Sequence, residues 1–218
     1  MALAANALTT LKVVLDELSL TMDNGQQDAR LEHYINAASD WVAQHCGRTL
    51  QRADAIAEGV KGFGGVLLRV ARPPIVAITS IAIDGGTVDA AGYAVQDAER
   101  GVIFRGACWP WTAVARAGIT SPQVPGWEDH TRIVVTYNGG WVTPSQAAAG
   151  LFSASPRTLP YQIEDACVRL VASRWRSRGT DGRLVSESTS NMSITFDGWA
   201  IPKTVLAALS PFAKYPVG

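Results

Sequence analysis

Hydrophobic positions recur with two different periods along the chain, and this divides it into helical and strand-forming regions. Apolar residues recur at helical spacing in three segments, at about residues 9–18, 27–46 and 161–178. Between the second and third segments, from about 49 to 140, the spacing changes to the alternation typical of strands. We therefore predict an α+β fold: a small helical bundle with an inserted, mostly antiparallel β-sheet unit, an extended arm and a C-terminal tail.

The second helical segment mixes apolar residues with residue types that also build catalytic and metal sites. Its predicted inner face carries Leu31, Tyr34, Ile35, Ala38, Trp41, Val42, His45 and Cys46. His33 and Asp40 fall on the opposite face, so a site shared with His45 and Cys46 is not expected. Gly47 stands where a left-handed C-terminal cap belongs. The segment is best explained as the packing face of a helix.

The third helical segment combines an apolar stripe with a basic cluster. The stripe is formed by Ile163, Ala166, Cys167, Leu170, Val171 and Trp175. The cluster consists of Arg169, Arg174, Arg176 and Arg178. These cations can simply offset the helix dipole and solvate an exposed face. The functional alternative is a positive lining near DNA or a docking patch for an acidic partner, and the sequence leaves both interpretations open.

The strand-forming region contains five short β-type runs and one long loop. The runs lie at 65–70, 78–84, 93–96, 101–105 and 132–137. The loop, 107–130, carries Trp109, Trp111 and Trp127, and a loop of this length is uncommon without a function. Its aromatics could stack on sugars or bases, so a ligand-binding module is one hypothesis. The "GFGG" run at 62–65 lacks the Lys-Ser/Thr of a phosphate loop and precedes a strand, so we do not expect phosphate binding there.

The C-terminal part follows a different pattern. Residues 180–199 have no helical period and are predicted to form an arm or hairpin. Within it, Met192, Ile194 and Phe196 alternate like an edge strand, so we expect the arm to become ordered on assembly and to add a strand to a neighbouring subunit. Residues 200–218 are predicted to be a short helix and tail, which leaves 1–179 as the main domain.

Composition narrows the classes of function. The 218 residues include 19 basic and 19 acidic residues, so the basic excess of a dedicated nucleic-acid binder is absent. The low charged share of 17% suits either a partner-binding surface or a large core. Three widely spaced cysteines suit reduced thiols better than a metal knuckle or a disulfide framework. We find no catalytic motif, no membrane-length apolar run and no secretory signal, and we expect neither an enzyme nor a cofactor.

The order of these segments resembles the head–tail connector (adaptor) proteins of long-tailed bacteriophages, over about residues 8–179. Three motifs carry the resemblance. The first is made by Ile35, Ala37, Ala38, Ser39, Trp41, Gly47 and Arg48; the second by Pro74, Ile75, Ile78, Ser80, Ile81, Ile83, Asp84 and Gly85; the third by Val135, Tyr137 and Gly140. The chain departs from the family pattern in the longer segments 107–130 and 145–160.

The resemblance implies a structural protein of the virion, at the head–tail interface, which is present in the host cytoplasm during assembly. Such proteins are expected to form a homo-oligomeric, twelve-fold ring beneath the portal protein. The ring extends the DNA channel and receives a stopper or tail-completion protein, while genomic DNA passes through without tight binding. Under this hypothesis the tail docks on the portal through Phe212, Lys214 and Tyr215. Another ring protein of the neck or tail shares most of these features and is the alternative.

Overall fold

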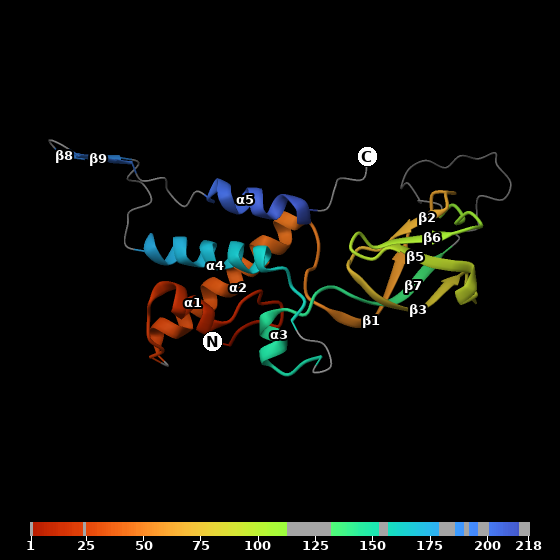
Figure 1. Ribbon diagram of the computed structural model, residues 1–218, viewed down its shortest axis with the longest axis horizontal. Helices are drawn as coiled ribbons and strands as arrows, with labels where there is room; N and C mark the ends of the chain where they lie inside the picture. Colours follow the sequence, from red (N-terminus) through yellow and green to blue (C-terminus); the bar gives the residue numbers. More distant parts are fainter. Residues whose placement is uncertain are drawn as a thin grey trace, which may run out of the picture. The chain divides into compact units, whose positions relative to one another are not determined.

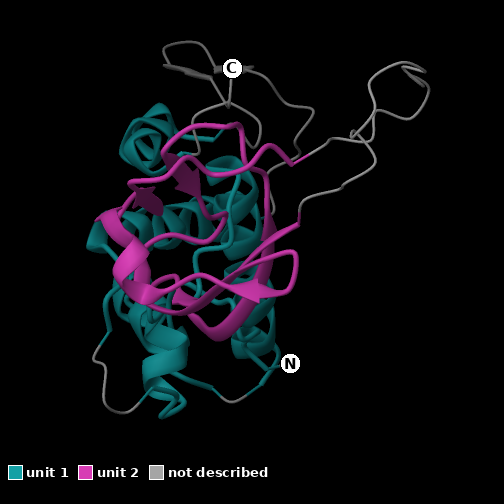
Figure 2. Cartoon of the chain, turned by 90° about the vertical axis from the view of Figure 1, so that its right-hand side faces the viewer, with its two compact units in different colours: residues 1–51, 142–218 teal, residues 52–141 magenta. Residues whose placement is uncertain are grey.

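The computed structural model describes residues 2–23, 25–112, 132–152, 157–178, 186–189, 192–195 and 201–213. The chain forms two compact units, a helical unit of residues 1–51 and 142–218 and a sheet unit of residues 52–141 (Figure 2). Packed helices together with antiparallel sheets confirm the α+β class (Figure 1). The predicted boundaries at 179 and 199 remain predictions.

The helical unit is built around α4 (Tyr161–Arg176). It packs against α1 (Leu11–Leu18), α2 (Gln26–Cys46) and α5 (Lys203–Leu209), so segments far apart in sequence share one core. All six residues of the predicted α4 stripe are buried, as the helical period requires. None of the helices that the model describes combines the length and the apolar character needed to cross a membrane.

The inner face of α2 was predicted correctly except at its last turn. Leu31, Ile35, Ala38, Val42 and Cys46 are buried, and Gly47 adopts the left-handed conformation of the cap at φ 63°. His45 was placed on this face, but it is exposed. Its ring stacks on that of Trp41, with centroids 5.0 Å apart and planes 12° apart. This stack covers the imidazole's flat face while its polar nitrogens keep access to water.

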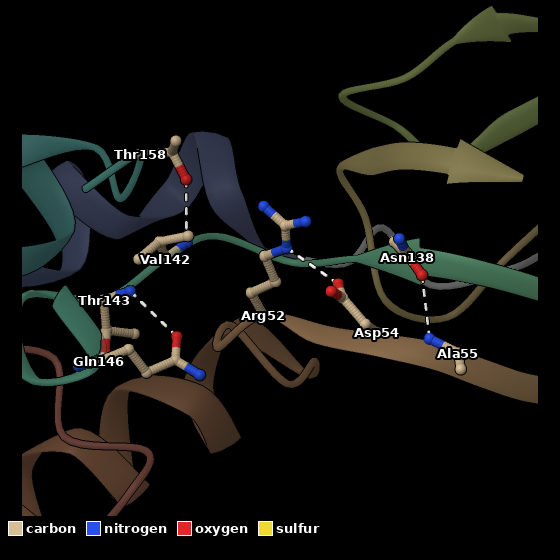
Figure 3. A network of polar contacts seen from close by, with 8 residues as sticks. All are labelled: Arg52, Asp54, Ala55, Asn138, Val142, Thr143, Gln146 and Thr158. Atoms are coloured by element: carbon tan, nitrogen blue, oxygen red, sulfur yellow. Dashed lines mark hydrogen bonds and ion pairs between the residues drawn. The ribbon is translucent and has the colours of Figure 1, made fainter. Parts of the chain in front are cut away.

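Capping residues fix where the smaller helices begin. The Thr10 side chain accepts a hydrogen bond from the Val13 N–H and starts α1. The insert after residue 141 contains α3 (Pro144–Ala148), which the sequence analysis missed. Thr143 and Gln146 form a capping box at its start (Figure 3). Pro160 and Pro202 directly precede α4 and α5, where a missing N–H costs nothing.

The sheet unit contains two antiparallel sheets. One has the order β1-β7-β3-β4 and the other β2-β6-β5. The strands are β1 (Ala53–Val60), β2 (Leu67–Arg69), β3 (Ile75–Ile83), β4 (Gly86–Thr87), β5 (Tyr93–Asp97), β6 (Val102–Arg105) and β7 (Ile133–Gly139). Both sheets contribute to one apolar core: Ile81, Ile133, Val135 and Tyr137 come from the first, and Leu68 and Ile103 from the second.

β1 was not predicted, because its sequence "ADAIAEGV" consists mostly of small residues. Only Ile56, Glu58 and Val60 alternate toward the interior, and the other positions are alanine, aspartate or glycine. Tertiary pairing with β7 makes the strand, with a bulge between Ala53 and Ile56. The Ala55 N–H leaves the regular ladder and donates to the Asn138 side chain at 2.9 Å (Figure 3).

The arm contains an antiparallel pair of strands, β8 (Ser186–Thr189) and β9 (Met192–Thr195). The assignment of residues 180–199 as a whole to an arm or hairpin stays a prediction. Met192 and Ile194 lie on β9, whereas Phe196 lies outside the described residues. A lone pair of strands is only marginally stable in water, which keeps strand addition to a neighbour as a prediction.

Candidate interaction surfaces

The residue types that perform catalysis are dispersed or engaged in packing. No group of three or more His, Cys, Asp or Glu residues is positioned to hold a metal ion in the described ranges. Cys46 and Cys167 are buried, and Cys108 is exposed. Burial raises the pKa of the Cys46 thiol and raises the pKa of the Cys167 thiol to about 12, so neither is a thiolate nucleophile at neutral pH.

A polar cluster that the sequence analysis did not identify fixes the core of the helical unit. The Glu164 carboxylate is buried; its Oε1 accepts a hydrogen bond from the Thr9 hydroxyl at 3.1 Å, and its Oε2 lies 2.6 Å from Arg157 Nη2. On the same helix, the Cys167 sulfur lies 3.6 Å from the Ser39 hydroxyl, which also donates to the Ile35 carbonyl. The Thr9–Glu164 and Ser39–Cys167 contacts join segments distant in sequence, so they help to specify how the helices pack.

The predicted basic cluster is largely engaged within the helical unit. Arg169 forms an exposed i,i+4 ion pair with Asp165 at 2.7 Å. The guanidinium of Arg174 lies 4.5 Å from the ring centre of Tyr34 on α2, and that of Arg178 lies 3.4 Å from the ring centre of Trp175. These contacts support the structural interpretation for three of the four arginines. Arg176 is exposed and remains the best candidate for a docking role.

A second polar cluster holds the sheet unit together. The Tyr137 hydroxyl donates to Glu58 Oε2 at 2.6 Å and accepts from the Arg72 N–H at 3.1 Å. Both oxygens of Glu58 also accept from the Ala71 N–H, at 2.9 and 3.0 Å. Burial, followed by the bond to Glu58, raises the pKa of Tyr137 well above its ordinary value. Saturated hydrogen bonding makes this a structural clamp rather than an acid–base site.

The "GFGG" run (62–65) lies against "CWPW" (108–111), at the start of the tryptophan-bearing loop. The Trp109 N–H donates to the Gly65 carbonyl at 2.7 Å, and the Thr112 N–H donates to the Gly62 carbonyl at 3.1 Å. Gly62 and Gly64 permit this approach, because a Cβ at either would lie about 2 Å from Pro110 or Trp111. The glycines therefore serve close packing and not phosphate binding. The sequence shows that one run is rich in glycine and the other in tryptophan. It does not show that the two runs pair.

The two tryptophans of this pairing have opposite environments. Trp109 is fully buried, its indole N–H donates to the Val66 carbonyl at 3.1 Å, and the Arg105 guanidinium lies 5.2 Å from its ring centre. Trp111 is 70% exposed and contacts the 56% exposed Phe63 edge to face, with ring centres 6.4 Å apart. One tryptophan anchors the loop and the other is displayed to solvent. Trp127 lies outside the described residues.

The predicted portal-docking residues are only partly described. Phe212 lies in a short 3₁₀ turn (Ser210–Phe212) after α5 and is half-buried. Lys214 and Tyr215 lie outside the described residues, so their role stays a prediction.

Comparisons with known proteins identify the fold. No protein-family model and no curated protein matches the chain. Solved structures do match it over 100% of its length. One is a chain from the neck of an empty GTA particle computed with C6 symmetry (19% identity, 95% of that chain, TM-score 0.55). Others come from the virion of the native gene transfer agent particle (16%, 95%, 0.57) and from the native neck computed with C12 symmetry (18%, 94%, 0.54). At this identity, the likeness shows a shared fold.

Proposed function

We propose that the protein is a structural component of the neck of a phage-like particle and forms a ring beneath the portal that joins the DNA-filled head to the tail. The observation that carries the proposal is the fold match, which extends over the whole chain and nearly the whole length of chains from particle necks. One of these necks was computed with twelve-fold symmetry, which agrees with the ring size that the family resemblance implies.

The charge distribution supports this role. A ring around a DNA channel should not grip the phosphates tightly, because that would oppose ejection. The chain has equal numbers of basic and acidic residues, and three of the four arginines of the basic cluster are engaged with neighbouring side chains. A repeated head-to-tail contact also needs two different complementary faces on each copy. The exposed apolar residues of the sheet unit can supply one of them.

The mode of attachment follows from the C-terminal segments. We assign portal docking to the tail, with Phe212, Lys214 and Tyr215 as its contacts, and strand addition between copies to the β8–β9 arm. Deletion of residues 211–218 should abolish attachment to the portal while leaving the two units folded. Undiminished attachment of this truncated chain would disprove the docking role of the tail.

The direct test is to add the purified protein to tailless, DNA-filled heads and to image the portal vertex by electron microscopy. A new annulus under the portal, with DNA retained or with a tail then able to join, is the expected result. A folded protein that adds no density beneath the portal would contradict the proposal. Density appearing only after another neck protein has bound would favour the stopper or tail-completion role.

A further inference from the structure

The exposed apolar residues of the sheet unit are concentrated on one irregular two-stranded ribbon, formed by residues 61–69 and 102–112. We call it the aromatic ribbon. Leu67 and Phe104 are directly opposite each other on β2 and β6, so their side chains share a face, and both are at least 40% exposed. Further along lies the exposed Phe63–Trp111 pair. Clustered exposure of this kind marks an interaction site.

Packing and backbone hydrogen bonds within the chain itself hold the ribbon in shape. Trp109 is buried beneath it, and backbone hydrogen bonds continue past β2 and β6, from the Arg105 N–H to Val66 and from the Thr112 N–H to Gly62. Gly64, at φ 70°, lies against the indole of Trp111 so closely that no side chain fits there. Preorganised aromatics lose little conformational entropy on binding. The ribbon is thus suited to be an interface anchor.

Charge indicates the chemistry of the partner. The ribbon contains Lys61, Arg69 and Arg105 and neither Asp nor Glu, so it carries three positive charges. Lys61 and Arg69 are exposed. The whole sheet unit has eight basic and eight acidic residues, so this excess is local to the ribbon. A partner surface that complements the ribbon is therefore apolar and bordered by acidic residues.

Such a surface occurs on the helical unit of the same chain. Residues 11–23, α1 and the segment after it, expose Val13 (39%) and Met22 (55%). Asp16, Glu17 and Asp23 are exposed beside them. With Lys12 as the one base among these residues, the segment carries two net negative charges. Methionine adapts its shape readily and packs well against aromatic rings. We call this the acidic α1 surface.

We propose that the aromatic ribbon of one copy docks on the acidic α1 surface of the next copy and forms the repeating contact of the ring. The two surfaces are different and lie on different units, so the contact is heterologous and can propagate around a ring. Single-stranded nucleic acid is a poorer fit, because the exposed aliphatic Leu67 and Val66 provide neither a ring for base stacking nor a charge for phosphate. The proposal rests on the ring role given above.

A charge-swap experiment on heads tests the contact. Asp16→Lys/Glu17→Lys makes the α1 surface basic, and Lys61→Glu/Arg69→Glu makes the ribbon acidic. Each variant alone should form at least about tenfold less ring than the unmodified chain, since like charges then meet at every contact. An equimolar mixture should restore ring formation, because alternating copies again present opposite charges. Glu99→Lys, an exposed reversal in the β5–β6 turn, is the matched control and should form rings normally.

The outcomes separate the two proposals. Rings from the unmodified chain and from each reversed variant alone would overturn this contact and leave the neck role intact. No ring from the unmodified chain would instead count against the neck role.

If the unmodified chain forms no ring on heads, a photo-crosslinker at position 111 still tests the contact. The protein is crosslinked in solution at high concentration, with a single-stranded oligonucleotide present. Crosslinks to residues 11–23 of a second copy support the proposal. No crosslinked dimer, or crosslinks to the oligonucleotide or elsewhere on the chain, would overturn it.

Discussion

The two units of the molecule differ in how they use some of their aromatic and charged side chains. In the helical unit, Glu164 and Arg157 pair in or near the core, and Arg174 covers the ring of Tyr34. In the sheet unit, by contrast, Trp111 and Phe63 are displayed on a prearranged ribbon. Since both units have their own buried core, this difference does not reflect incomplete folding of the sheet unit. The exposed aromatic pair thus belongs to the sheet unit, whereas these contacts of the helical unit hold its own segments together.

The largest effect on stability is expected for Trp109, which is fully buried in the core of the sheet unit. Trp109→Ala should lower the free energy of unfolding of the sheet unit by about 3–5 kcal/mol, because it leaves a cavity and removes the hydrogen bond to Val66. Trp111→Ala is the matched control, two residues away. It should change stability by about 0.5 kcal/mol or less but weaken ring formation. Urea unfolding measures the first effect and electron microscopy the second; equal destabilisation by both would contradict the distinction.

The buried ion pair of the helical unit should have the next largest effect. Glu164→Gln keeps an acceptor for Thr9 but removes the charge facing Arg157, and should cost about 1–3 kcal/mol. Asp165→Asn, at the next residue, removes the exposed pair with Arg169 and should cost about 0.5 kcal/mol or less. Urea unfolding of both variants provides the measurement. If they lose equal stability, Glu164 does not organise the core.

Cys167 predicts a pH dependence. Its pKa is raised from 9.0 to about 12 in the folded state, chiefly by burial, so the unfolded state releases this proton first as the pH rises. The stability that this raised pKa contributes is therefore fully present below pH 9 and is lost progressively between pH 9 and 12. Between pH 8 and 10 the loss should be about 1 kcal/mol greater than in Cys167→Ala, which removes the thiol. Parallel pH profiles of urea stability for the two proteins would contradict this assignment.

The helical unit was easier to predict from the sequence than the sheet unit. The apolar residues of the helical unit follow a strong 3.6-residue period, so α1, α2 and α4 and most of their buried faces could be predicted from the sequence. β1 could not, because its alanines and glycine have little strand preference and its pairing with β7 spans some eighty residues of sequence. The pairing of "GFGG" with "CWPW" is also non-local. The exposure of Trp111 beside a buried Trp109 depends on that pairing.

The smallest effects concern the arginines at the end of α4, where stability and docking must be separated. Arg174→Met keeps an apolar stem but removes the cation over Tyr34, which joins α4 to α2, and should cost about 0.5–1 kcal/mol. Arg178→Met loses only a local contact with Trp175, three residues earlier in the chain, and should cost less. Arg176→Ala should leave urea stability unchanged, since the side chain is exposed.

Arg176 is therefore the residue with which to test the channel or docking role of this cluster. If Arg176→Ala attaches to heads like the unmodified protein, then a loss of attachment in Arg174→Met reflects weakened helix packing and not a lost contact with a partner. If Arg176→Ala instead reduces attachment at unchanged stability, the end of α4 contributes a contact of its own, in addition to those proposed for the acidic α1 surface and the tail.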